Sequence, residues 1–129
     1  MNEWETESNL ERWTYREHDC VVLRIENLGH LCGYASFHKE DISKIDTTEI
    51  HVHGGVTYES SGLHIVDPDS KKYWIGFDCA HYGDLVPSMS EKGLSVGHET
   101  YRNIEYVKNQ TEQIVDSAID MIKTNYKEY

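Results

Sequence analysis

The last quarter of the chain carries a repeating apolar pattern that restricts the fold more than any other feature. In TYRNIEYVKNQTEQIVDSAIDMIKTNY, apolar side chains recur at spacings of three, four and seven residues: Ile104, Val107, Ile114, Ala118 and Ile122. Such spacings align side chains on one face of an α-helix. We therefore predict a helix over about residues 101–124, with Thr100 as its N-cap and a length of roughly 36 Å. Its apolar face must cover a sheet or pair with a second copy of the chain.

The residues before this helix have the alternation of β-strands. Residues 21–26, VVLRIE, place apolar side chains at every second position, which is typical of a strand with one buried face. The residues NLG that follow favour a turn, and 33–37 are expected to form the return strand. Further short strands are expected at 49–52, 63–66 and 71–78. The last of these is aromatic and β-branched, which favours a central position in the sheet.

Together these patterns predict an α+β fold, with a small antiparallel sheet and one long C-terminal helix, in a single domain spanning residues 1–129. Residues 79–99 contain three glycines and one proline, so we expect this segment to be mostly loop. A loop of that length inside a compact domain usually has a function.

Charge and composition exclude some classes of partner. The chain has 23 acidic residues against 12 Lys and Arg, a net charge of −11, and no basic stripe. Because such a charge repels phosphate backbones, we expect no nucleic-acid partner. No apolar run reaches the length of about 20 residues that a membrane helix needs, so we expect no membrane partner either. An acidic N-terminus and three cysteines without CxxC spacing favour a cytoplasmic location with reduced thiols.

The stretch IHVHGG, residues 50–55, is the first candidate site. On an extended strand His51 and His53 point to the same side, about 7 Å apart, so both imidazoles can bind one divalent metal. Gly54 and Gly55 can adopt positive φ, and their successive N–H groups can form an anion-binding nest.

The stretch FDCAHYGD is the second candidate. Asp78, His81 and Asp84 follow each other at intervals of three residues, just after a predicted strand. Carboxylates beside imidazoles suit a divalent metal, the hydroxyls of a ribose, or a buried polar network. If the two strands are neighbours, His53 and Asp78 can meet. Cys79 is interpreted as a buried thiol rather than a nucleophile.

His38, at the end of a predicted strand, is added to the site. Most of the other histidines are expected at the surface. They are His18, His30, His64 and His98.

Four stretches carry a resemblance to a known family: GYASFHKED, VHGGVTYES, YWIGFDCAHYGDLVP and TYRNIEYVKNQTEQIVDSAI. They resemble a widespread family of small phage and prophage proteins with VHGG(L/I)TY and GFDCAH.GD motifs, over about residues 19–119. The family's motif positions correspond here to His38, His53, Gly54, Gly55, Thr57, Tyr58, Gly76, Phe77, Asp78, Cys79, His81, Gly83, Asp84 and Tyr101. The position of His51 varies in that family. The resemblance therefore favours a site made of His53 with Asp78, His81 and Asp84 over a metal site made of His51 and His53. The resemblance implies a phage origin.

Three functions remain open. In the first, the protein binds and sequesters a nucleotide-derived signalling molecule to counter host defence, as a homo-oligomer in the host cytoplasm and without a cofactor. The expected ligand-binding residues are His53, Gly54, Gly55, Thr57, Tyr58, Trp74, Asp78, His81, Tyr82 and Asp84. In the second, a divalent metal on the histidines and aspartates makes the protein a hydrolase. In the third, the protein inhibits a host enzyme by surface contact.

Overall fold

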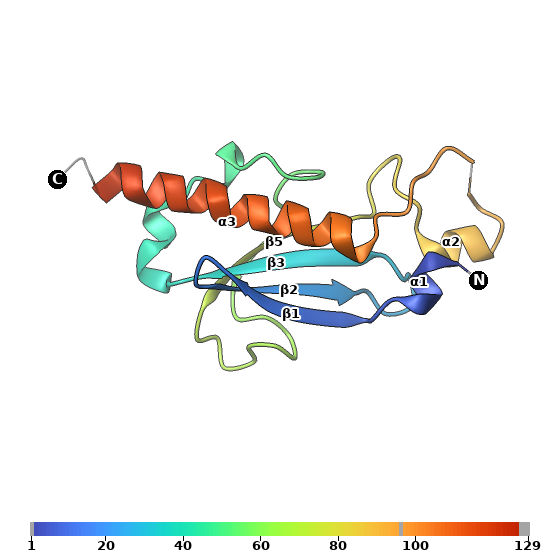
Figure 1. The fold of residues 1–129 in the computed structure, drawn as a ribbon, viewed down its shortest axis with the longest axis horizontal. Helices are drawn as coiled ribbons and strands as arrows, with labels where there is room; N and C mark the ends of the chain where they lie inside the picture. Colours follow the sequence, from blue (N-terminus) through green and yellow to red (C-terminus); the bar gives the residue numbers. More distant parts are fainter. Residues whose placement is uncertain (1, 96, 127–129) are drawn as a thin grey trace.

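The computed structural model describes residues 2–95 and 97–126, and in these residues a five-stranded antiparallel sheet lies against one long helix (Figure 1). The sheet has the order β1-β2-β3-β5-β4. Its strands are β1 (Leu10–Tyr15), β2 (His18–Arg24), β3 (Leu31–Phe37), β4 (Tyr58–Ser61) and β5 (Tyr73–Asp78). The helices are α1 (Glu3–Thr6), α2 (Pro87–Glu91) and α3 (Ile104–Tyr126), with 3₁₀ turns η1 (Lys39–Lys44) and η2 (Thr47–Glu49). The predicted α+β class is confirmed. None of the helices in these residues is long and apolar enough to cross a membrane.

The face of the sheet toward α3 holds the larger core. Val107, Ile114 and Ala118 of α3 are fully buried against a cluster that includes Phe37 and Phe77. The apolar stripe recognised in the sequence is therefore core, and burial of Val107 and Ile114 contributes roughly 1.5–3 kcal/mol each. Because the stripe is buried against the sheet, the stripe is not available for pairing with a second copy of the chain.

The opposite face of the sheet is also covered, by the loop at 62–70 (Figure 1). Leu63 of this loop packs with Val21, Tyr34 and Trp74 in a second cluster. The prediction of a strand with one buried face was therefore wrong at the centre of β2, where Val21 and Val22 are each 1% exposed. Strands with both faces covered lose their alternation.

Glycine allows α3 to approach β3 closely. A Cβ atom at Gly33 would collide with Thr111 Oγ1 and with the ring of Phe77. Thr111 is fully buried and donates its hydroxyl hydrogen to the carbonyl of Val107, 2.7 Å away. This contact fixes the part of α3 that carries the side chains of the candidate site.

The helix begins later than predicted. α3 starts at Ile104, and Asn103 is its cap, since Asn103 Oδ1 accepts from the backbone N–H of Tyr106 at 2.9 Å. Thr100 pairs instead with the segment around Asp84: its N–H donates to Gly83, and its carbonyl accepts from Leu85. A residue tied to a neighbouring segment in this way does not start a helix.

Two further expectations were wrong. Residues 49–52 are not a strand, because η2 ends at Glu49 and irregular backbone follows. Residues 63–66 form a tight loop, closed by two hydrogen bonds exchanged between Leu63 and Asp67 at 3.1 and 2.7 Å. The segment 79–99 is mostly loop, as expected, and includes the short helix α2, which begins at Pro87, where the fixed φ of proline suits a first helical position.

Candidate functional site

His53 is held by three hydrogen bonds in the irregular segment between η2 and β4. Its backbone N–H donates to Gln110 Oε1 at 2.8 Å. Its ring Nδ1 lies 2.8 Å from the hydroxyl of Tyr106, and its Nε2 lies 2.9 Å from each carboxylate oxygen of Asp84. Both ring nitrogens thus have partners, and α3 supplies two of the three groups that position this imidazole.

Asp84 is the centre of the polar cluster. Its side chain is fully buried and accepts hydrogen bonds from His53, from Arg102 Nε at 2.9 Å and from the backbone N–H of His81 at 3.0 Å. Burial by itself raises the pKa of Asp84, but these hydrogen bonds outweigh it and hold the pKa below its ordinary value. The same hydrogen bond from Nε raises the pKa of Arg102. The carboxylate is therefore an ionised structural anchor.

Asp78 and His81 form a second pair beside the first. His81 Nε2 lies 2.9 Å from Asp78 Oδ1. The carboxylate is out of line for a hydrogen bond, however, and this buried nitrogen has no hydrogen-bond partner among the described residues. We therefore regard the pair as an electrostatic contact. Thr57 donates to the same carboxylate oxygen at 3.1 Å, and the rings of His81 and His53 are 6.1 Å apart.

The two glycines after His53 have different roles. Val52 and Gly55 close a four-residue turn through a 2.8 Å hydrogen bond, and Gly54 occupies the position in that turn that needs a positive φ, here +69°. A Cβ atom on Gly54 would also collide with the ring of His81. Because the N–H of Gly55 is used in the turn, it is not available to the expected anion-binding nest.

The structure brings most of the expected ligand-binding residues to one end of the sheet. His53, Gly54, Thr57, Asp78, His81 and Asp84 are linked by the contacts above, and Gly55 and Tyr82 adjoin them in sequence. The expected meeting of His53 with Asp78 is replaced by two pairs, His53 with Asp84 and His81 with Asp78. The turn at 81–84, closed by a hydrogen bond from the Asp84 N–H to the His81 carbonyl, folds the later carboxylate back.

Tyr58 and Trp74 lie elsewhere. Both belong to the second cluster, on the face away from α3. The Tyr58 ring packs edge-on against Tyr34 with centroids 5.2 Å apart, and Trp74 is 2% exposed and donates its Nε1 hydrogen to Asp67. Their side chains are engaged in packing and are not placed with the others.

The structure also places Cys79 and three other histidines that the sequence singled out. His51 is exposed, and His38 is exposed at the start of η1, at the opposite end of the sheet (Figure 1). His30, expected at the surface, is 5% exposed, and burial lowers its pKa. Cys79 is a buried thiol whose pKa is raised by burial, as expected from the sequence. In the described part of the chain, no three His, Cys, Asp or Glu side chains are grouped to hold a metal ion.

Sequence reasoning missed three side chains of the cluster, namely Arg102, Tyr106 and Gln110. Arg102 bonds Asp84 and lies over the ring of Tyr106, its guanidinium carbon 5.2 Å from the ring centre. The three recur at intervals of four residues beside the apolar stripe. That polar stripe at helical spacing is the signal that identifies them.

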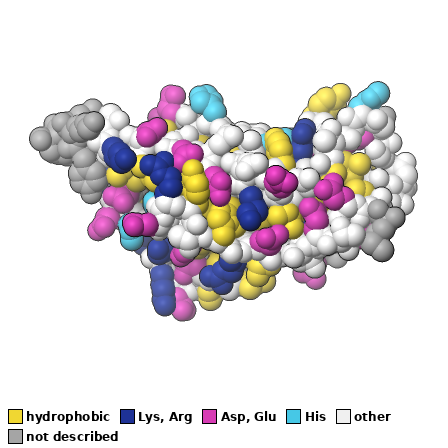
Figure 2. Space-filling model, viewed as in Figure 1, with side chains coloured by type: hydrophobic (Ala, Val, Ile, Leu, Met, Phe, Trp, Pro, Cys, Tyr) yellow, Lys and Arg dark blue, Asp and Glu magenta, His cyan; other side chains and the backbone are white. Residues whose placement is uncertain are grey.

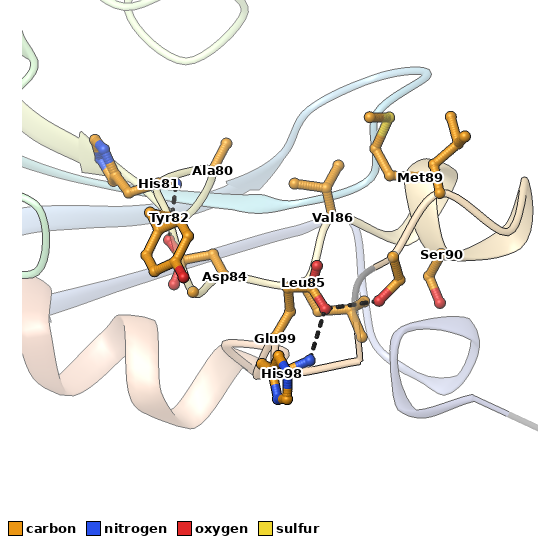
Figure 3. A pocket seen from close by; sticks show the side chains of 13 residues that line it. Ala80, His81, Tyr82, Asp84, Leu85, Val86, Met89, Ser90, His98 and Glu99 are labelled. Carbon is orange, nitrogen blue, oxygen red and sulfur yellow. Dashed lines mark hydrogen bonds between the residues drawn. The ribbon is translucent and has the colours of Figure 1, made fainter.

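A pocket of about 400 Å³ adjoins the cluster (Figure 3). Thirteen described residues between Ala80 and Glu99 form its wall, and His81 and Asp84 belong to both the wall and the polar cluster. Most of the lining is apolar, including Val86 and Met89. The long segment after β5 therefore encloses a space beside ordered polar groups.

Protein-family models, curated proteins and solved structures were each compared with the chain, and none of them matches it. The role of the site is accordingly inferred from its geometry.

Proposed function

We propose that this chain binds a small nucleotide-derived signalling molecule in the pocket beside His81 and sequesters it, as a phage-type protein that counters host defence in the host cytoplasm. The observation that carries the proposal is the pocket of about 400 Å³ that shares His81 with the polar cluster. Pockets for small ligands typically have volumes of roughly 300–1,000 Å³ and mostly apolar walls with a few polar groups. This pocket has both properties.

The hydrogen bonding of the cluster favours binding over turnover. Both ring nitrogens of His53 are engaged, and the Asp84 side chain is fully buried. A general base must have a nitrogen or oxygen within reach of the proton that it removes. His53 and Asp84 therefore act as positioning residues: Asp84 accepts from the backbone N–H of His81 at the pocket wall, and His53 holds Asp84.

Calorimetric titration with a panel of cyclic dinucleotides and ADP-ribose isomers tests the proposal. We expect at least one member to bind and to be recovered intact after the protein is denatured. His81→Ala should weaken that binding about fivefold or more, the equivalent of losing one hydrogen bond. His64→Ala is the matched control, because His64 is exposed on the 62–70 loop, which covers the face of the sheet away from α3. No binding by any member contradicts the proposal, and recovery of an altered ligand shows an enzyme instead.

The inhibitor of a host enzyme remains the second candidate, favoured by the exposed apolar side chains at the pocket rim. Tyr82, Met89 and Leu94 are 104%, 43% and 58% exposed, and all three line the pocket. Exposed apolar patches often mark contact surfaces. If the chain is such an inhibitor, a stoichiometric complex with one host enzyme should form, and Leu94→Lys should break it without changing the stability of the free chain.

The metal-dependent hydrolase has less support, because the described residues offer no ready set of three ligands. Elemental analysis of protein purified without a metal-affinity tag tests it directly, and stoichiometric zinc or manganese would favour it over sequestration.

A further inference from the structure

We infer that the pocket takes a flat, uncharged heteroaromatic ring, such as the nucleobase of a nucleoside, and leaves any phosphate of the ligand outside in water. This inference rests on the proposed function and specifies which part of the ligand the pocket recognises. The charge of the lining and the position of the exposed apolar side chains support it independently.

The charges around the pocket disfavour a phosphate. None of the thirteen described lining residues is Lys or Arg, whereas Asp84 and Glu99 are both among them. Glu99 Oε1 accepts from Ser95 Oγ at 2.7 Å and from the backbone N–H of His98 at 3.1 Å, so its carboxylate is held at the pocket. Arg102, the arginine of the polar cluster, is paired with Asp84. The buried Asp84 carboxylate is balanced by Arg102, so it is Glu99 and the net charge of −11 on the chain that would repel a phosphate in this pocket.

The same acidity is visible over the surface. Figure 2 shows Asp and Glu side chains spread over the viewed face, with Lys and Arg side chains interspersed among them. Hydrophobic side chains are also exposed toward the end of the molecule where α2 lies. A ligand that approaches this end therefore meets apolar and acidic groups.

The exposed apolar side chains gather at the pocket. In the described residues six large hydrophobic side chains are exposed, and three of them, Tyr82, Met89 and Leu94, line this one space. Figure 3 shows Tyr82 and Met89 on either side of Val86. An aromatic ring and a polarizable thioether are suited to contact the faces of a flat ring. Stacking of this kind tolerates any base, because every nucleobase has a π-face.

The volume sets the size of the group that enters. A space of about 400 Å³ is near the lower end for small-ligand pockets. A nucleobase with its ribose fits that lower end better than a complete dinucleotide. His81 lines the side of the pocket next to the polar cluster, which is where a polar edge of the ring or a ribose hydroxyl would then lie.

Calorimetry with adenosine, guanosine and their 5′-monophosphates, at low and at high salt, tests the inference. We expect at least one nucleoside to bind as tightly as its monophosphate or more tightly, and monophosphate binding to hold or improve as salt screens the repulsion. A monophosphate that binds about tenfold more tightly than its nucleoside, and more weakly at high salt, overturns the inference but leaves the proposed function in place. Failure of the nucleosides, their monophosphates and the whole dinucleotide and ADP-ribose panel to bind overturns both.

Substitution of Tyr82 gives a second, independent readout. Because Tyr82 is fully exposed, Tyr82→Ala should fold normally and weaken nucleoside binding roughly fivefold or more, whereas Tyr82→Phe keeps the ring and should bind like the parent chain. Ile65→Ala is the matched control, since Ile65 is 67% exposed on the loop across the sheet. Equal affinity of the Tyr82→Ala and Ile65→Ala variants would overturn the stacking role.

Discussion

At the scale of single residues, Gly54 and Gly55 differ although they are neighbours. Both have positive φ, +69° and +82°. A Cβ atom on Gly54 would collide with the His81 ring, whereas one on Gly55 would meet no atom within 4 Å. Side chains at such φ values cost about 1 kcal/mol in either position, and displacement of a packed ring adds roughly 1–3 kcal/mol.

Gly54→Ala should therefore destabilise the chain by about 2–4 kcal/mol and Gly55→Ala by only about 1 kcal/mol. Denaturant unfolding of the two variants beside the parent chain measures the difference. Because both substitutions have the same backbone strain, Gly55→Ala is the internal control. Equal losses would mean that the His81 ring does not lie against Gly54.

Asp84 provides a prediction about pH. Its lowered pKa in the folded chain means that the ionised carboxylate stabilises the fold at every pH above its unfolded pKa of about 3.9. That contribution is lost as the pH falls through the lower folded value. Protonation removes the acceptor for His53 and the charge that faces Arg102.

Asp84→Asn should cost about 3 kcal/mol at neutral pH, the lower end for breaking a buried ion pair, since Arg102 can still reach water. We expect this loss relative to the parent chain to be nearly constant down to about pH 4 and to shrink below it. Urea unfolding at a series of pH values measures it, with Asp69→Asn, at an exposed position, as the control. A loss that grows as the pH falls below 4 would contradict the role of the ionised form.

At the scale of elements, the distance between α3 and β3 depends on Gly33. The absence of a side chain there lets Thr111 and Phe77 occupy the space that a Cβ atom would fill. Gly33→Ala should destabilise the chain by roughly 1–3 kcal/mol, the usual effect of adding an atom to a packed core.

Thr111→Ala removes the hydroxyl that the new methyl group would meet. The double variant should therefore lose less stability than the sum of the two single variants, with a coupling of about 0.5 kcal/mol or more. Thermal unfolding of the four proteins in this cycle measures the coupling. Strict additivity would show that α3 does not rest on Gly33 through Thr111.

The elements also show what local pattern can predict. The apolar stripe identified α3 because helical spacing and burial come from the same face. Its start was misplaced because Thr100 pairs with Gly83 and Leu85, a contact between distant segments that no local pattern contains. The strands at 49–52 and 63–66 were wrong for a related reason: short apolar runs also occur in loops that cover a core, as Leu63 does.

At the scale of the whole molecule, the sequence located the candidate site but not its pairing. The spacing of histidines and aspartates indicated that His53, Asp78, His81 and Asp84 belong together. Which imidazole meets which carboxylate depends on the turn at 81–84 and on the position of α3 over the sheet. The same arrangement assigns Trp74 and Tyr58 to the second core, a distinction that needs the third dimension.

The acidity of the whole chain also restricts the kind of ligand that the pocket can hold. A net charge of −11 opposes a phosphate-binding site, yet it is compatible with a pocket that holds an uncharged ring. In the proposed function, the cluster around Asp84 keeps the pocket wall in place. Binding and sequestration need no more than this.

The most direct test of the central claim is an NMR titration of the isotope-labelled chain with ADP-ribose and with the cyclic dinucleotides. If the pocket beside His81 is the binding site, at least one ligand should shift the amide signals of residues 80–95 saturably and leave those of the 62–70 loop unchanged. Absence of saturable shifts with every ligand, or shifts confined to the face that carries Trp74, would contradict binding in the pocket beside His81.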